Sequence, residues 1–391
     1  MPNILDYLGW RGDLTLAQDP FNEVDSLVLC QLSYLDLAGI VPGPGDGGSV
    51  TLKAAARAFA DRHAADADGG APGGLVSPLT PALLARAGAS ARFGGARLSR
   101  YEAHCESGAK TAEQFGAMCF ALGDGTTYVA FRGTDDTFAG WREDFEMSFS
   151  VVPSQRRALA YLEGARRATW GRLRVGGHSK GGNLAIYAAA KAGWLTRRRV
   201  ADVWSHDGPG FCAGTLDERA WRAVEGRVHH YVPQFCIVGQ LLEQRCPSTV
   251  VASATPGIMQ HSAMNWQVTG NRFERRDAID EGARRVGEVF DGVIQGKDAE
   301  WRRRLTDAVF GSLAAGGSTM GELADGAPAS YARVARAYLG VDPELQQAVQ
   351  TVVGSLVGES FSKALATAQA TMADAWSGLF GRSETPDVRK D

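Results

Sequence analysis

The 391-residue sequence predicts an α/β fold, in which the strands of a mostly parallel sheet alternate with helices. The first observation is that short β-prone runs alternate with helical runs over residues 95–270, as they do in βαβ units. The second is a strand, a glycine-rich turn and an Ala-rich helix in succession over residues 172–193. The third is the set of strand-like runs after this helix, at residues 200–206, 227–232 and 248–253.

The glycine-rich turn at residues 176–182 reads Gly-Gly-His-Ser-Lys-Gly-Gly and places Ser179 at the centre of a Gly-x-Ser-x-Gly frame. A nucleophile elbow requires this frame between a strand and a helix. Gly177 and Gly181 suit such an elbow, because strand and helix approach closely there and the nucleophile takes strained backbone angles. A tight turn with an idle serine is the alternative. With the flanking pattern in place, the sequence predicts an α/β-hydrolase fold with Ser179 as the nucleophile.

The region before the elbow is expected to complete the sheet and to cover it. Strands are predicted at residues 98–105, 111–122 and 127–132, and a helix at residues 154–168. Residues 1–94 are expected to form a segment of helices and loops that packs on a core of residues 95–275. The helices predicted in this segment span residues 21–36, 52–63 and 79–88.

Residues 276–380 carry only helical patterns and are expected to form a C-terminal helical region. Its predicted helices span residues 278–294, 299–315, 331–339 and, with breaks, 343–380. The last is rich in Ala and Val and could contact a membrane surface, although packing or self-association is the commoner role of such a helix. Residues 381–391 are polar and predicted to be disordered.

Composition excludes several classes of function. A net charge of −3 gives no electrostatic case for nucleic acid, and we interpret the arginine runs at 197–199 and 302–304 as solvated helix faces or ends. The sequence has no signal-peptide pattern and no apolar run of about 18 residues, so we expect a cytoplasmic protein without a transmembrane segment. The six cysteines form no C-x-x-C pair, so we expect reduced thiols and no metal site.

A serine nucleophile needs a histidine base, which follows the serine in the chain of an α/β-hydrolase. His261 is the last histidine and comes in a loop after the third strand that follows the elbow, so it is the predicted base. A polar loop histidine without a catalytic role is the alternative. The other histidines are less suitable: His178 flanks the serine and should point away from it, and His206, His229 and His230 belong to strands.

The carboxylate that orients the base is harder to choose. Asp207 directly follows the predicted strand at residues 200–206 and is the preferred candidate. Asp217 and Glu243 are weaker candidates, and a backbone carbonyl near Gln234 is a further alternative. In its Asp-Gly-Pro-Gly context, Asp207 could instead cap a turn.

An oxyanion hole needs two backbone N–H groups. The residue after the nucleophile, Lys180, should provide one. Thr134 should provide the other, because Arg132-Gly133-Thr134 ends an early strand and the threonine hydroxyl can hold the loop. No cofactor or metal is implied by these residues.

Three segments resemble the class 3 lipase pattern: residues 128–134 with Arg-Gly-Thr, residues 140–144 with Gly-Trp-Arg-Glu-Asp, and residues 177–185 around Ser179. More closely, the chain resembles a bacterial branch of lipase-like α/β-hydrolases, known as a domain of unknown function, that shares segments like 21–34, 207–211 and 257–261. The resemblance covers about residues 1–270 and implies an Arg-Gly-Thr oxyanion loop and a serine nucleophile. Class 3 lipases carry their acid in an Asp-x-Val-Pro segment, but the counterpart here, residues 232–238, has no carboxylate.

These patterns together predict a serine hydrolase that cleaves a small acyl ester or a lipid ester through Ser179, His261 and Asp207. A thioesterase or an amidase could use the same three residues. A lipase-like binding protein without catalysis is the alternative from another class, and the missing carboxylate at residues 232–238 is what motivates it.

Overall fold

The computed structural model describes residues 1–71, 76–107, 112–135, 137–294, 296–319, 322–323 and 329–357. The chain divides into two compact units, Met1–Ala299 and Glu300–Asp391. The first unit contains the sheet and all the residues predicted to act in catalysis. The described part of the second unit contains helices.

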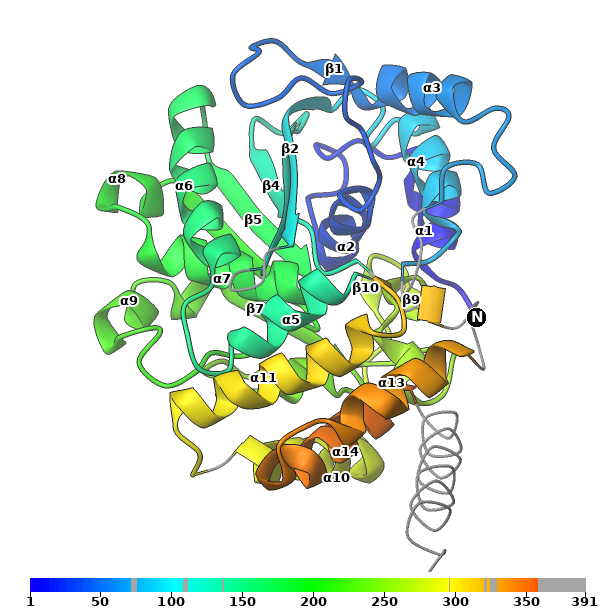
Figure 1. The fold of residues 1–391 in the computed structure, drawn as a ribbon. Helices are drawn as coiled ribbons and strands as arrows, with labels where there is room; N and C mark the ends of the chain where they lie inside the picture. The colour runs from blue at the N-terminus through cyan, green and yellow to red at the C-terminus, as the bar shows by residue number, and fades with distance from the viewer. Residues whose placement is uncertain are drawn as a thin grey trace, which may run out of the picture. The chain divides into compact units, whose positions relative to one another are not determined.

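The first unit is built on an eight-stranded sheet whose spatial order is the order of the strands in the chain (Figure 1). Strands β4 to β8 run parallel to one another, whereas β1 to β4 form antiparallel pairs. The α/β prediction is therefore confirmed. The strands are β1 (Val50–Thr51), β2 (Arg97–Ser107), β3 (Ala112–Ala121), β4 (Thr127–Phe131), β5 (Leu173–His178), β6 (Val200–His206), β7 (Val228–Pro233) and β8 (Ser248–Val251).

Helices cover both faces of this sheet, because successive strand residues point to opposite sides and both sides are apolar. On one face, Phe115 and Phe131 pack with α6 (Pro153–Ala168) and α7 (Lys180–Lys191). On the other face, Phe120 and Tyr128 pack with α2 (Glu23–Leu32). Figure 1 shows α2 and α7 on opposite sides of the central strands.

The N-terminal segment forms the helices expected for it, with one more at its start. Its helices are α1 (Ile4–Arg11), α2, α3 (Leu52–Arg62) and α4 (Thr80–Ala89). Asn22 caps the N-terminus of α2 through a capping box with Asp25, so the helix starts at the position where the apolar spacing begins. A small sheet of β9 (Val268–Thr269) and β10 (Arg272–Phe273) completes the elements after β8.

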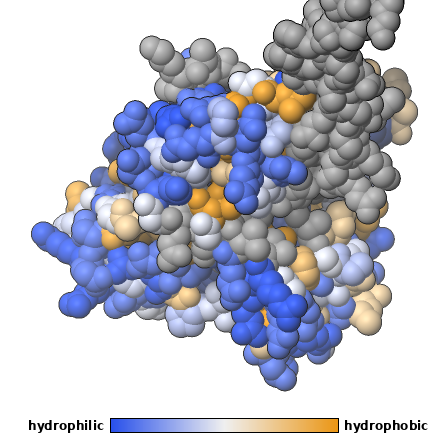
Figure 2. All heavy atoms as spheres, turned by 60° about the horizontal axis from the view of Figure 1, so that its bottom comes forward, coloured by the Kyte–Doolittle hydropathy of each residue, from blue (hydrophilic) through white to orange (hydrophobic). Residues whose placement is uncertain are grey.

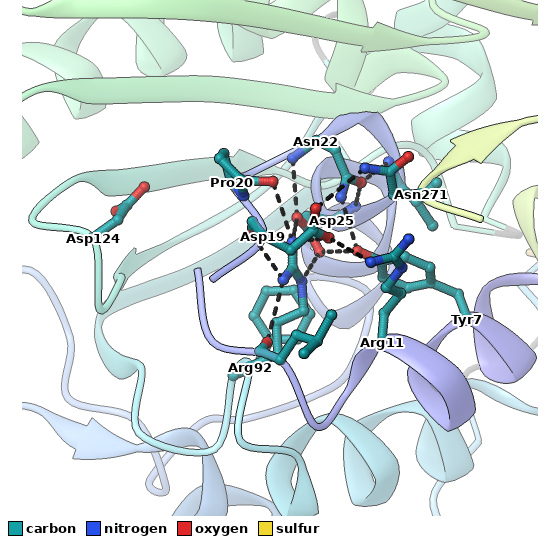
Figure 3. Close-up of polar contacts among 12 residues, drawn as sticks. Tyr7, Arg11, Asp19, Pro20, Asn22, Asp25, Arg92, Asp124 and Asn271 are labelled. Carbon is teal, nitrogen blue, oxygen red and sulfur yellow. Dashed lines mark hydrogen bonds and ion pairs between the residues drawn. The ribbon is translucent and has the colours of Figure 1, made fainter. Parts of the chain in front are cut away.

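A buried polar network joins these N-terminal helices (Figure 3). Arg92 donates through Nε to Asp25 Oδ1 at 2.6 Å and through Nη2 to Asp25 Oδ2, and both side chains are inaccessible to solvent. The hydroxyl of Tyr7 donates to the same Asp25 Oδ1 at 2.8 Å and accepts a hydrogen bond from Asn22. The network thus ties α1, α2 and the segment that follows α4 together with hydrogen bonds that water does not screen.

We expect Arg92→Met to lower the free energy of unfolding by about 3–5 kcal/mol, because it leaves the Asp25 carboxylate buried without its cation. Arg57→Met is the matched control, since the 3.9 Å pair of Arg57 with Asp61 is exposed and should contribute less than about 1 kcal/mol. Urea unfolding of both variants measures the difference. Equal losses of unfolding free energy in the two variants would show that the buried network does not stabilise the N-terminal helices.

The helices predicted after residue 276 are present in the described residues. The first unit ends with α10 (Glu281–Ile294) and the start of α11 (Ala299–Ala314), and the second unit contains α13 (Ala329–Leu339) and α14 (Pro343–Val357). The rest of the predicted helix at 343–380 and the tail at 381–391 lie outside the described residues. No described helix is long and apolar enough to cross a membrane. Figure 2 shows a face on which hydrophilic residues dominate and apolar residues are exposed in small separate areas.

Candidate active site

Ser179 lies in the tight turn between β5 and α7, as the glycine frame predicts. Its backbone angles, φ 58° and ψ −134°, are strained for a residue with a side chain. Hydrogen bonds hold the turn in this form: Ser179 N donates to His206 O at 2.9 Å, and Gly182 N donates to Ser179 O at 2.8 Å. Such a strained turn, held by backbone hydrogen bonds at the end of a central strand, is typical of a nucleophile elbow.

The glycines of the frame are needed because backbone segments meet there. A Cβ on Gly177 would lie 2.1 Å from the carbonyl carbon of Gly181, and a Cβ on Gly181 would lie 2.2 Å from Phe131 O. No real Cβ approaches backbone atoms so closely. Helix α7 can therefore start directly above the ends of β4 and β5 only with glycine at both positions.

The structure brings His261 and Asp207 together, although 54 residues separate them. Asp207 follows β6, and His261 ends the short helix Gly257–His261 after β8. His261 Nδ1 and Asp207 Oδ2 are 2.6 Å apart. Because an ionised carboxylate only accepts hydrogen bonds, Nδ1 carries the proton and the lone pair of a neutral ring is on Nε2.

The other oxygen of Asp207 is also bonded. Gly239 N and Cys236 Sγ each donate to Asp207 Oδ1 at 3.0 Å. Burial alone would raise the pKa of this solvent-inaccessible carboxyl group, but the hydrogen bonds and charges around it, His261 first, hold the pKa below its ordinary value. The segment 232–238, where class 3 lipases carry their acid, thus supplies Cys236 as a donor to Asp207 instead, and Gly239 follows it directly.

The other candidate carboxylates lie elsewhere. Asp217 caps the short helix Glu218–Arg222, accepting from Ala220 N at 2.8 Å, and pairs with Lys191. The side chain of Glu243 is 62% exposed and faces Arg245 at 4.0 Å. Of the three carboxylates, Asp207 is the one bonded to His261.

His178 differs from the expectation that its side chain points away from the site. Its ring centre is 4.7 Å from that of His261, and its Nε2 lies 2.8 Å from the His261 carbonyl oxygen. Since a carbonyl accepts, His178 Nε2 donates, and Nδ1 accepts from the Tyr34 hydroxyl at 3.0 Å. Burial, together with the charge of His261, lowers the pKa of His178 to about 3, so the ring is neutral and keeps this arrangement at physiological pH. His178 thus fixes the backbone of the predicted base.

We expect His178→Phe to lower kcat for ester hydrolysis by about 10- to 100-fold with little change in KM, because a ring of similar size remains but the bond to the His261 carbonyl is lost. The estimate assumes about 1–3 kcal/mol for a buried carbonyl left unpaired. Tyr34→Phe is the control. It removes only the hydrogen bond from the Tyr34 hydroxyl to His178 Nδ1, so it should lower kcat less than His178→Phe does. Steady-state kinetics on short-chain esters checks both. A wild-type kcat in His178→Phe would assign no positioning role to this ring.

The predicted oxyanion loop packs directly on the elbow. A Cβ on Gly133 would lie 2.5 Å from His178 O and 3.1 Å from Ser179 Cβ. The adjacent Thr134 donates its hydroxyl to Asp144 Oδ2 at 2.6 Å, so the side chain holds the loop as expected. Asp144 belongs to α5 (Phe138–Glu146), a helix that the sequence patterns did not predict. The backbone N–H of Lys180, in the first turn of α7, has no acceptor within its helix.

A buried ionic cluster links this loop to the elbow, and no sequence pattern predicts it. The Lys180 side chain is inaccessible to solvent, and its Nζ lies 3.1 Å from Glu143 Oε2 and 3.6 Å from Asp144 Oδ1. Burial would lower the pKa of Lys180, but the two carboxylates raise it, so the ammonium stays charged. Burial raises the pKa of Asp144 to about 6, against the opposing effect of Lys180. Both proposed oxyanion donors therefore belong to residues whose side chains contact α5.

The described residues contain one group of metal-ligand type, and it does not belong to this site. The ligand atoms of His104, Glu106 and Glu113 on the β2–β3 hairpin lie within 4.8 Å of one another. Arg157 already binds both carboxylate oxygens of Glu113. Its guanidinium supplies the positive charge that a metal ion would bring.

The carboxyl ends of β4, β5 and β6 therefore meet around Ser179, which is the usual place for a site in an open α/β sheet. The model of the family described as Mbeg1-like matches residues 87–311, more than half of the 391 residues. The match spans Thr134, Ser179, Asp207 and His261. No curated protein matches the sequence. The chain belongs to the Mbeg1-like family.

Proposed function

We propose that this protein is a serine hydrolase of the α/β-hydrolase type that cleaves carboxylic esters. The observation that carries the proposal is the 2.6 Å bond between His261 and the buried Asp207. The ring of His261 lies 4.7 Å from that of His178, the residue that precedes Ser179 at the strained strand–helix turn. Membership in a lipase-like family supports a hydrolase in general terms. Ester cleavage and the roles of the individual residues are our inference from the geometry.

In this mechanism the Ser179 Oγ attacks the ester carbonyl carbon while His261 Nε2 accepts its proton. Asp207 stabilises the imidazolium that forms and keeps the proton on Nδ1. The negative charge on the carbonyl oxygen is stabilised by the backbone N–H groups of Thr134 and Lys180 and by the N-terminus of α7. The tetrahedral intermediate expels the alcohol, which takes the proton from His261. Water then cleaves the acyl-enzyme by the same steps.

The side chain of Lys180 has a separate role in this proposal. Its charge is matched by Glu143 and Asp144, which lie against it, so it does not act as a free cation on the oxyanion. It fixes the first residue of α7 relative to α5, and α5 in turn fixes Thr134 through Asp144. The two oxyanion donors are held in register by this cluster, which is the preorganisation that an oxyanion hole needs.

A fluorophosphonate probe tests the proposal, because it phosphonylates an activated serine and not an idle one. We expect stoichiometric labelling at Ser179, identified by peptide mass spectrometry, and no labelling of Ser179→Ala. Absence of labelling at Ser179 in folded protein would overturn the proposal in favour of a lipase-like binding protein. Parallel assays with matched esters, thioesters and anilides separate an esterase from a thioesterase or an amidase on the same triad.

A further inference from the structure

We propose that the protein docks on anionic lipid bilayers through a surface at the start of the parallel strands, formed by residues 166–172 and 194–199. We name it the arginine–tryptophan surface, after the side chains that it exposes. This inference goes beyond the proposed hydrolase activity and does not depend on it. In the sequence the two segments are separate, and the arginine run at 197–199 is interpreted only as a solvated helix end.

The fold brings the two segments together. Residues 166–172 comprise the end of α6 and its connection to β5. Residues 194–199 contain α8 (Trp194–Arg197) and lead into β6. Because β5 and β6 are adjacent and parallel, their starting ends lie side by side. Arg199 joins them, donating to Gly171 O and Arg166 O at 2.6 Å each. Figure 1 shows α8 beside α6 at this side of the sheet.

Large apolar side chains are exposed on this surface. Trp170 is 92% exposed, Trp194 60% and Leu195 56%. The described residues contain seven large hydrophobic side chains that are at least 39% exposed, and three of them lie in these two short segments. Tryptophan is the residue most typical of the membrane–water interface, where its ring lies at the level of the headgroups.

The same surface carries several arginines, and the Glu163 carboxylate beside α8 binds Gly193 N and Thr196 Oγ1. Its six arginines form no ion pair with a carboxylate of the described chain: Arg166, Arg167, Arg172, Arg197, Arg198 and Arg199. The guanidinium of Arg198 lies over the Trp194 ring at 4.7 Å. Burial and the charge of Arg166 lower the pKa of Arg199. A protein with a net charge of −3 thus concentrates six arginines that form no ion pair with the described carboxylates in two short segments.

An anionic bilayer fits this combination better than a nucleic acid does. Each arginine near an anionic membrane contributes about 1 kcal/mol to the free energy of binding. The exposed indole rings favour the membrane–water interface, whereas binding to nucleic-acid bases does not require such an interface. Leu195 gives no hydrogen bond or stacking contact to a nucleotide, but it can enter the headgroup region. Ser179 follows β5 at the opposite end from this surface, so docking there leaves the candidate active site uncovered.

Co-sedimentation of the full chain with vesicles tests the proposal. We expect binding to vesicles of phosphatidylcholine with 30% phosphatidylglycerol, little binding to phosphatidylcholine alone, and release in about 0.5 M NaCl. Arg167→Gln/Arg198→Gln should weaken binding about tenfold or more, and Trp170→Ser/Trp194→Ser should weaken it as well. These variants leave the hydrogen bonds of Arg199 in place, so the surface keeps its structure.

Arg57→Gln/Arg62→Gln is the matched control, because it removes two arginines from α3 and should bind vesicles as the wild type does. Wild-type binding by both surface variants, or no binding to anionic vesicles, would overturn the proposal. Tight binding of a single-stranded RNA oligonucleotide without vesicle binding would assign the surface to nucleic acid instead. Hydrolysis of a soluble ester is measured on the same samples, so loss of docking and failure of the proposed hydrolase activity are distinguished.

Discussion

Replacing Ser179 by alanine should lower kcat for short-chain nitrophenyl esters by about 10⁶-fold, the typical loss when a triad serine is removed. The reason is that no other hydroxyl occupies the strained turn between β5 and α7, where the oxyanion donors and His261 are proposed to act. Initial rates with excess substrate measure the loss against the uncatalysed background. A variant that retains more than a small fraction of the wild-type rate would contradict the assignment of Ser179.

The fold of Ser179→Ala should be unchanged, because the hydrogen bonds that hold the turn are made by backbone atoms. A melting temperature near that of the wild type confirms that lost activity is not lost structure. Ser205→Ala is a useful second control, since Ser205 lies in β6 and is also buried. It should keep most of the wild-type kcat.

The elements of the first unit could be predicted from the sequence because their signals are local. The strand–glycine–helix pattern around Ser179 is contained in about twenty residues, and the strands β6, β7 and β8 each read as a short β-prone run. Helix α5 could not be predicted in this way. Its buried residues are Phe138, Gly140 and Glu143, so two of the three give no apolar signal. Glu143 is buried because it pairs with Lys180, a contact between distant segments.

The supporting contacts of the candidate site could not be predicted because they join distant segments. The bond between Tyr34 and His178 spans 144 residues, and nothing in the sequence near His178 indicates its partner. The position of Asp207 after a strand favours it as the acid, but only the structure places Cys236 and Gly239 against its second oxygen. Sequence patterns identify the type of residue that a site needs, whereas the side chains that orient it depend on tertiary contacts.

Asp207→Asn should lower kcat by about 10⁴-fold, the typical cost of placing the base in the wrong tautomer. The structure gives a specific reason. The Oδ1 position receives two donors, Gly239 N and Cys236 Sγ, so the amide oxygen of the asparagine is held there. The amide NH₂ then faces His261 Nδ1 and donates to it. The proton of a neutral His261 must move to Nε2, where the ring can no longer accept the Ser179 proton.

The residual rate of Asp207→Asn should exceed that of Ser179→Ala, because the nucleophile and oxyanion donors remain. Asp217→Asn is the matched control and should keep the wild-type kcat, since Asp217 caps a surface helix. The alternative role of Asp207, as the cap of the following Gly-Pro-Gly turn, gives a different result: a lower melting temperature with nearly normal kcat per folded molecule. Both quantities measured on one preparation therefore decide between an orienting acid and a structural cap, and an unchanged kcat would remove Asp207 from the proposed triad.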